Sequence, residues 1–167
     1  MSDVRVRPAV EGEYEAIGEL TVAAYERSGQ LSGETNGYRD ELVDVAGHAR
    51  EGEVLVAVQP DGEVVGSVLF VLPGSVYAEL AAPGDAEFRM LAVAPRAQGR
   101  GIGEALVRAC VDRARAIGAR AIVISARDFI EAPQRLYRRL GFVRVPERDW
   151  SPVPGVVSLV ALRLDLS

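Results

Sequence analysis

The chain has 167 residues, of which 49% are hydrophobic and 26% are charged, and its formal net charge is −5. This length and composition are typical of one globular domain with a buried core, so we expect a single domain over residues 1–167. The acidic balance argues against nucleic acid or an anionic membrane as the main partner.

Cys110 and His48 are the only cysteine and histidine. Cys110 lies on the apolar stripe of a predicted helix, which favours a buried structural thiol over a nucleophile. Neither a His-dependent triad nor a metal site is expected. The amino terminus lacks an apolar signal core, and no later run approaches about 18 apolar residues. We therefore predict a cytoplasmic protein.

The first third of the chain predicts one strand and two helices. Alternation over Val4–Ala9 indicates a short strand, and apolar residues recur at helical spacing over Glu11–Glu26. Ser28–Gly37 interrupts regular structure, and Tyr38–Arg50 predicts a second, shorter helix.

A hairpin and a central strand are expected next. Val54–Val58 and Val64–Val71 flank Gln59–Gly62, whose Asp-Gly pair is a hairpin signal. Pro73–Gly84 is a linker of small residues, and Ala86–Val93 predicts a strand. Alternation would put one set of its side chains on a common face: Glu87, Arg89, Leu91 and Val93.

Helices and strands alternate in the remainder of the chain. Ile102–Ile117 has helical spacing and is followed by Gly118 as a C-terminal cap. After it we expect a strand over Ala121–Ser125, a helix over Glu131–Leu140 and two more strands, over Phe142–Val145 and within Val156–Leu164.

A glycine-rich run, Arg96-Ala97-Gln98-Gly99-Arg100-Gly101-Ile102-Gly103, joins the central strand to the following helix. The first turn of a helix has unpaired N–H groups and a partial positive charge, so it suits a phosphate or pyrophosphate. The glycines allow close approach of such a ligand, and the two arginines can add charge-assisted bonds. A purely flexible turn is the alternative interpretation.

Two common phosphate-binding motifs, the mononucleotide P-loop and the dinucleotide fingerprint, do not match this sequence. No Gly-Lys-Ser/Thr follows Gly103, and the third glycine of a dinucleotide fingerprint would fall at Glu104. The pattern Arg/Gln-x-x-Gly-x-Gly/Ala does fit, and it resembles the acetyl-CoA-binding signature of the GNAT superfamily of N-acetyltransferases. A second run, Arg135–Phe142, is similar to the family's Leu-Tyr-x-x-x-Gly-Phe.

The order of the predicted elements also resembles the GNAT order. The resemblance implies an α/β (α+β) fold of three layers, with a mixed central sheet of about seven strands flanked by about four helices. It also implies acetyl-CoA as acyl donor and direct transfer to a primary amine in a ternary complex, with no acyl-enzyme.

The resemblance implies cofactor contacts residue by residue. In the family the two central strands splay apart, usually beside a β-bulge, and the pantetheine arm enters the gap. The backbone of Leu91, Ala92 and Val93 would then bond the pantetheine amides. The pyrophosphate would be held by the loop, namely Arg96, Gln98, Gly99, Arg100, Gly101, Ile102 and Gly103. Ile130 stands where many relatives have asparagine, and Ser125 is a substitute polar contact.

Two residues are candidates for proton transfer. Tyr137 matches the tyrosine that in many relatives protonates the departing thiolate, although a core tyrosine bonded to a backbone carbonyl is the alternative. Glu87 matches a glutamate base, with a solvated or Arg89-facing charge as its alternative. Asp85 is a weaker candidate, because it follows Pro83-Gly84 in an expected turn.

The acceptor stays open at this stage, and a small-molecule amine, an amino acid, an antibiotic and a peptide or protein amino group are all compatible with the sequence. In the family its pocket is built from the loop after the first helix, here Ser28–Gly37, and from the last hairpin, here Pro146–Gly155. Acidic and aromatic residues there would favour a cationic amine, unless they are ordinary loop residues: Glu34, Glu147, Asp149 and Trp150. A non-catalytic acyl-CoA-binding module is the rival function, and a homodimer is plausible.

Overall fold

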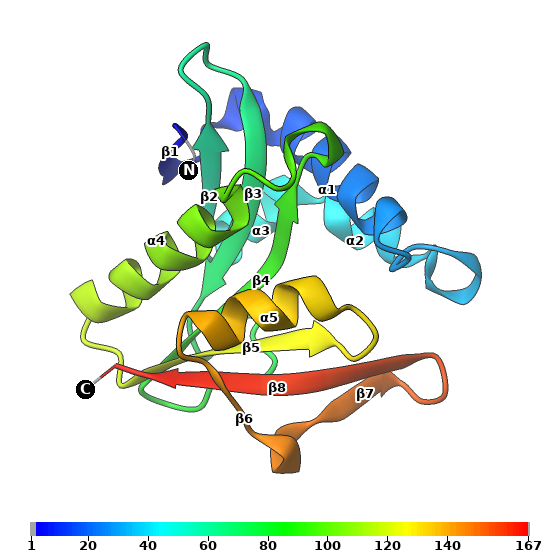
Figure 1. Cartoon of the computed structure of the whole chain (residues 1–167), viewed down its shortest axis with the longest axis vertical. Helices are drawn as coiled ribbons and strands as arrows, with labels where there is room; N and C mark the ends of the chain where they lie inside the picture. Colours follow the sequence, from blue (N-terminus) through cyan, green and yellow to red (C-terminus); the bar gives the residue numbers. More distant parts are fainter. Residues whose placement is uncertain (1–2, 167) are drawn as a thin grey trace. The chain divides into compact units, whose positions relative to one another are not determined.

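The computed structural model of the chain describes residues 3–166, which contain eight strands and five α-helices (Figure 1). The chain divides into two compact units. The first comprises the chain up to Phe70 together with Met90–Cys110, and the second comprises Val71–Arg89 together with the chain from Val111 onward. Strand β4 (Asp85–Val93) and helix α4 (Ile102–Ala116) contribute residues to both units.

The first unit also contains three strands and three helices, namely β1 (Arg5–Pro8), α1 (Tyr14–Arg27), α2 (Tyr38–Val43), α3 (Val45–Glu51), β2 (Glu53–Val58) and β3 (Val64–Val71, whose last residue belongs to the second unit). β2 pairs antiparallel with both β1 and β3. The Asp-Gly hairpin is confirmed, since Gln59 donates to Glu63 O at 2.9 Å and Gly62 has φ +92°.

The single helix expected over Tyr38–Arg50 is wrong, because Asp44 divides it into α2 and α3. The Asp44 backbone leaves the helical region at ψ 58°, and its carboxylate accepts the Gly47 N–H at 3.1 Å. Aspartate is a favoured N-cap because its side chain satisfies such an N–H group. A local side-chain bond therefore overrides the helical periodicity of the segment.

The second unit is built around β5 (Ala121–Arg127), which pairs with β8 (Val157–Asp165) over its whole length. The remaining elements are α5 (Glu131–Arg139), β6 (Val143–Arg144) and β7 (Trp150–Val153), and both of these strands pair with β8. β7 lies in the Pro146–Gly155 segment, where no strand was expected. The hydrogen-bonded strand order is β1-β2-β3-β4-β5-β8-β6, with β7 on β8.

Strand β4 has an irregularity at Met90, whose φ is +57°. Among residues 3–166 it is the sole non-glycine residue with positive φ. Left-handed backbone costs a side-chain-bearing residue about 1–2 kcal/mol and is typical of β-bulges next to functional sites. The parallel ladder between β4 and β5 pairs Asp85–Glu87 with Ala121–Val123, so it ends three residues before this point.

Asp85 anchors the start of β4, which corrects its expected place in a turn. Its side chain is fully buried and binds Arg120 Nε at 3.2 Å and Arg163 Nη1 at 3.5 Å. Its second oxygen accepts the Ala82 N–H at 3.0 Å. Every oxygen of this buried carboxylate therefore has a partner, which is the condition under which a buried charge is tolerated.

We predict that Asp85→Ala lowers the free energy of unfolding by about 3 kcal/mol, because it removes charge-assisted bonds in a buried setting. Asp165→Ala is the matched control, since Asp165 is exposed and also pairs with Arg163, at 2.8 Å. An exposed pair contributes about 0–1 kcal/mol. Urea unfolding of both variants measures the difference, and equal losses would contradict a special role for Asp85.

Candidate functional site

The glycine loop has the backbone that an anion site requires. Gly99 and Gly101 have φ of +82° and +79°, and an added Cβ would meet no atom within 4 Å at either position. The first bond of α4 runs from Ala105 N to Gly101 O at 3.1 Å. Within residues 3–166, the N–H groups of Gly101, Ile102 and Gly103 donate no hydrogen bond. These groups are thus available to a ligand.

Gly66 on β3 sets how closely α4 packs in the first unit. A Cβ added to Gly66 would lie 3.0 Å from Ile102 Cγ2, 3.0 Å from Leu106 Cδ1 and 3.2 Å from Ala92 O. Ile102 and Leu106 are both buried. The absent side chain of Gly66 therefore lets the first turn of α4 approach the sheet. The sequence reasoning missed this role, whose only signal was a glycine within a strand pattern.

The polar side chains of the loop differ in how far they are already bonded. Gln98 Nε2 donates to Val93 O at 3.2 Å, which ties the loop to the end of β4. Arg96 pairs with Glu63 at 2.6 Å, so its charge is partly balanced. Arg100 has only a long contact with Arg96 O at 3.5 Å and no carboxylate partner among residues 3–166. Arg100 is therefore the more available cation.

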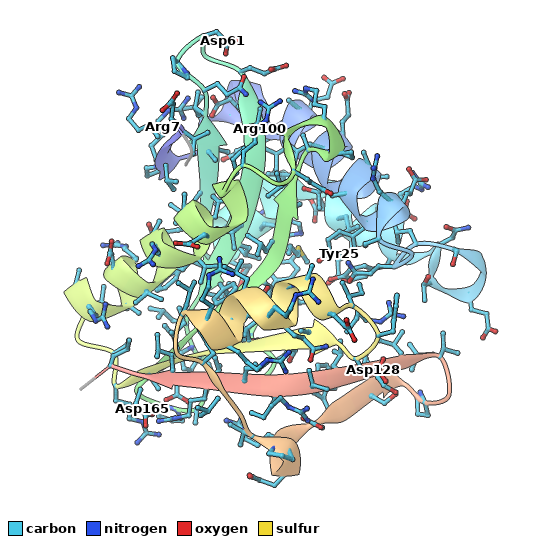
Figure 2. The ribbon with its side chains drawn as sticks, viewed as in Figure 1. Arg7, Tyr25, Asp61, Arg100, Asp128 and Asp165 are labelled. Atoms are coloured by element: carbon cyan, nitrogen blue, oxygen red, sulfur yellow. The ribbon has the colours of Figure 1, made fainter. Side chains whose placement is uncertain are left out.

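Arg100 also lines an open cavity of about 460 Å³ in the first unit. The loop contributes Gly99, Arg100 and Ile102, and the β2–β3 hairpin contributes Gln59, Pro60 and Asp61. Figure 2 labels Asp61 at the tip of that hairpin and Arg100 in the loop before α4. On β4, beyond Met90, Ala92 is buried while Leu91 and Val93 are half-buried.

In the second unit, Glu87 is completely buried, and one of its oxygens is held by three backbone donors. Oε1 accepts the N–H groups of Glu79, Leu80 and Ala81 at 2.9, 2.9 and 3.0 Å. Oε2 is buried and has no hydrogen-bond partner among residues 3–166. Burial raises the pKa of Glu87, while the three N–H groups and the Arg89 charge act to lower it. The carboxyl group thus has one oxygen left for chemistry.

Tyr137 is buried in a cluster of three aromatic rings. Its ring lies 5.7 Å from that of Phe88 and 5.8 Å from that of Phe142, centroid to centroid. Phe88 follows Glu87 on β4, and successive strand residues point to opposite faces. The Glu87 carboxylate contacts residues 79–81 while the Phe88 ring contacts Tyr137. Glu87 and Tyr137 therefore lie on opposite faces of β4.

Ser125 contacts the last hairpin on the face of the sheet to which the Glu87 side chain points, here called the Glu87 face. Trp150 Nε1 donates to Ser125 Oγ at 3.1 Å. Asp149 is engaged within the fold, since it pairs with Arg144 at 2.6 Å and accepts the Ala161 N–H at 2.8 Å. Its charge is consequently already balanced. Glu147 is exposed in the short turn before β7, and Glu34 belongs to the first unit.

The start of α5 is as expected, with Ile130 at its N-cap and no side-chain cap bond. Gln134 Nε2 instead donates to Arg127 O at 2.9 Å, and thereby closes the turn from β5 into the helix. Cys110 is fully buried, and burial raises the pKa of its thiol. The prediction of a buried structural thiol is therefore confirmed.

The described part of the chain, residues 3–166, has no group of three or more His, Cys, Asp and Glu side chains placed to hold a metal ion. Over the same residues, no helix combines the length and the apolar character needed to cross a membrane. The predicted site residues fall into two sets. Leu91–Val93 and the glycine loop belong to the first unit, and Glu87, Ser125 and Tyr137 belong to the second.

Comparison with known proteins identifies the family. The model of the acetyltransferase (GNAT) family matches residues 14–142. The chain therefore belongs to the GNAT family of acetyltransferases. Comparison with curated protein sequences gave no significant match.

Solved structures agree with this fold. The chain is similar to a Corynebacterium glutamicum protein described as histone acetyltransferase HPA2 and related acetyltransferase, with 23% identity, a TM-score of 0.75 and coverage of 100% of this chain and 98% of that one. A GCN5-related N-acetyltransferase from Kribbella flavida has 26% identity, a TM-score of 0.71 and 98% coverage of both chains. YncA from Salmonella typhimurium, solved with its cofactor acetyl-CoA, has 22% identity, a TM-score of 0.69 and coverage of 99% and 95%. The predicted GNAT-like α/β fold is confirmed.

We predict that the stability of the wild type falls relative to Glu87→Gln as pH rises. The folded pKa of Glu87 is raised, so its burial costs nothing while the group is protonated in both states. The loss of stability grows as the pH rises from the ordinary pKa of glutamate to the raised pKa of Glu87 in the folded state. Above that pKa the loss is constant. Urea unfolding over a pH series measures this difference, and a difference that does not change with pH would contradict the assignment.

Proposed function

We propose that this acetyltransferase is an N-acetyltransferase that moves the acetyl group of acetyl-CoA to a primary amine by direct attack in a ternary complex. The observation that carries the proposal is the glycine loop, where two positive-φ glycines precede a helix start with unbonded N–H groups. Such groups fit a pyrophosphate, and the open space at Gly99 and Gly101 fits its close approach.

The residues that would hold the cofactor follow from their available groups. The N–H groups from Gln98 through Gly103 would bind the pyrophosphate, with charge added by Arg100 and by Arg96. The backbone of Leu91, Ala92 and Val93, beyond the positive-φ residue Met90, would bond the pantetheine amides. Ser125 keeps its O–H as a donor, because Trp150 uses only an acceptor position of Oγ. When bound, acetyl-CoA supplies the thioester.

Glu87 would act as the general base. A protonated amine has no lone pair with which to attack, so a group must take its proton directly or through a water molecule. Oε2 is the Glu87 oxygen without a partner, and Oε1 is fixed by three N–H groups, which hold the carboxylate in one position. A raised pKa also makes Glu87 a stronger base than an ordinary carboxylate.

Tyr137 would act as the general acid and protonate the departing thiolate with its hydroxyl group. Its ring is fixed between Phe88 and Phe142. A fixed ring directs the hydroxyl without loss of side-chain freedom during the reaction.

Thiol release from acetyl-CoA tests the proposed function, with a panel of amino acids, polyamines, aminoglycosides and short peptides. Release that depends on an amine supports the enzyme. A thermal shift with CoA but no release with any amine would favour a non-catalytic acyl-CoA-binding module instead. Absence of both would overturn the assignment of the glycine loop to the cofactor.

We predict that Gly101→Ala weakens CoA binding roughly 10- to 100-fold, since a Cβ in the glycine loop displaces the charge-assisted bonds between the loop N–H groups and the pyrophosphate. Gly118→Ala is the matched control. Gly118 follows α4 with φ +78°, and a Cβ there meets no atom within 4 Å. Both substitutions therefore impose the same backbone strain, about 1–2 kcal/mol. Calorimetric titration with CoA measures the affinity of both variants. Equal affinities would contradict pyrophosphate binding by the glycine loop.

Tyr137→Phe is expected to lower kcat about ten- to ten-thousandfold, the range for loss of a general acid. The aromatic contacts persist in this variant, so CoA affinity should change little. Steady-state kinetics with the best amine of the panel measures kcat. An unchanged kcat would return Tyr137 to a structural role.

No acetyl group is expected on Cys110 after incubation with labelled acetyl-CoA, because the thiol is buried and its raised pKa keeps it protonated. Acetylation of lysine side chains cannot add to the signal, because all 19 Lys and Arg residues of the chain are arginine. Mass spectrometry of the peptide with Cys110 gives the answer. A labelled thiol that transfers its acetyl group to an amine would replace direct attack by a two-step route.

A further inference from the structure

Arg127, the last residue of β5, has a guanidinium group that forms no ion pair within residues 3–166. Its Nε is buried without a hydrogen-bond partner among residues 3–166, and it is the sole arginine of which this holds. The guanidinium lies 4.8 Å from the centre of the Phe129 ring. No carboxylate of residues 3–166 pairs with it. The group is thus oriented by an aromatic ring, and its donors remain unused.

Arg127 lies on the Glu87 face of the second unit. Glu87 is the register partner of Val123, and Leu80, whose N–H binds Glu87, packs on Val123 together with Trp150. Ser125, bonded to Trp150, is the next residue of β5 on this face, and Arg127 follows two residues later. Figure 1 shows β5, β8 and β7 side by side in this unit.

The other arginines on the Glu87 face of the second unit already have hydrogen-bond or ion-pair partners. Arg89 pairs with Glu79 at 3.2 Å and donates to Tyr77 O at 3.1 Å. Arg163 pairs with Asp165 and Asp85, and Arg148 donates to Leu80 O. Asp149 is balanced by Arg144 and is not available to an incoming cation. Of the arginines named on this face, Arg127 is therefore the one whose guanidinium has no hydrogen-bond or ion-pair partner among residues 3–166.

We propose that Arg127 binds an anionic group of the acceptor, so that the acceptor is an amine that also carries a carboxylate or a similar acid. A guanidinium matches a carboxylate with two parallel hydrogen bonds, and partial burial strengthens them. Val123 and Arg127 are separated by about 13 Å along the strand. An acceptor that reaches both groups would span the part of this distance that the Glu87 and Arg127 side chains do not cover. This inference rests on the proposed function, with Glu87 as base.

Matched acceptor pairs test the inference. Thiol release is measured with several amino acids and with the carboxamide of each, for the wild type, Arg127→Gln, Arg127→Lys and Arg115→Gln. Arg115 is the control because it is an exposed arginine at the end of α4. The carboxamide has the less basic amine, so chemistry alone would favour the amide.

For the wild type, we expect kcat/KM to favour the acid over its amide roughly 10- to 100-fold. Arg127→Gln abolishes this preference, chiefly through KM, Arg127→Lys restores part of it, and Arg115→Gln leaves it unchanged. Thermal shifts with CoA check that each variant is folded. Equal rates for acid and amide, or an intact preference in Arg127→Gln, would overturn the role of Arg127 while thiol release upholds the proposed function. No release with any amine would overturn both.

Discussion

The start of α4 presents backbone N–H groups that find no acceptor within residues 3–166, and the proposed chemistry depends on this constraint. Unbonded N–H groups are costly when buried and are normally capped by a side chain. Here Gly99 and Gly101, both with positive φ, lie just before the helix, leave the groups accessible and add no side chain of their own. A helix start of this kind is stabilised by an anion, so the loop and its ligand are linked energetically.

Strand β4 supplies Glu87 and, through Phe88, contacts Tyr137 of α5, the other proposed proton-transfer group of the second unit. Adjacent residues of a strand face opposite ways, so Glu87 and Phe88 direct a carboxylate to one side and an aromatic contact with Tyr137 to the other. Three N–H groups on a single oxygen offset part of the cost of burying Glu87, but burial still dominates its pKa. A carboxyl group that is both fixed and raised in pKa is suited to accept a proton.

Much of this arrangement could be predicted from the sequence, because it rests on local patterns. The glycine spacing, the Asp-Gly hairpin and the helical stripe ending at Gly118 are short-range signals, and the elements that they predicted are present. The division at Asp44 was missed because a single side-chain bond decided it. Strand β7 was missed because its pairing depends on β8, which no local pattern of the hairpin indicates.

The role suggested here for Arg127 could not have been predicted in the same way. It depends on which arginines find carboxylates and which do not, and that follows from long-range packing. The expected preference for a cationic acceptor illustrates the same difficulty, since the sequence displays Asp149 but not its bonds to Arg144 and Ala161. Charge in a sequence becomes informative about a ligand only when its partners are known.

The most direct test of the central claim is an NMR titration of ¹⁵N-glycine-labelled protein with CoA, which follows the loop amides individually. Binding through the loop predicts that the amide resonances of Gly99, Gly101 and Gly103 shift with CoA concentration, while that of Gly118, beyond the far end of α4, stays in place. CoA binding that leaves the three loop glycines unchanged would contradict the account, because the cofactor would then be held elsewhere.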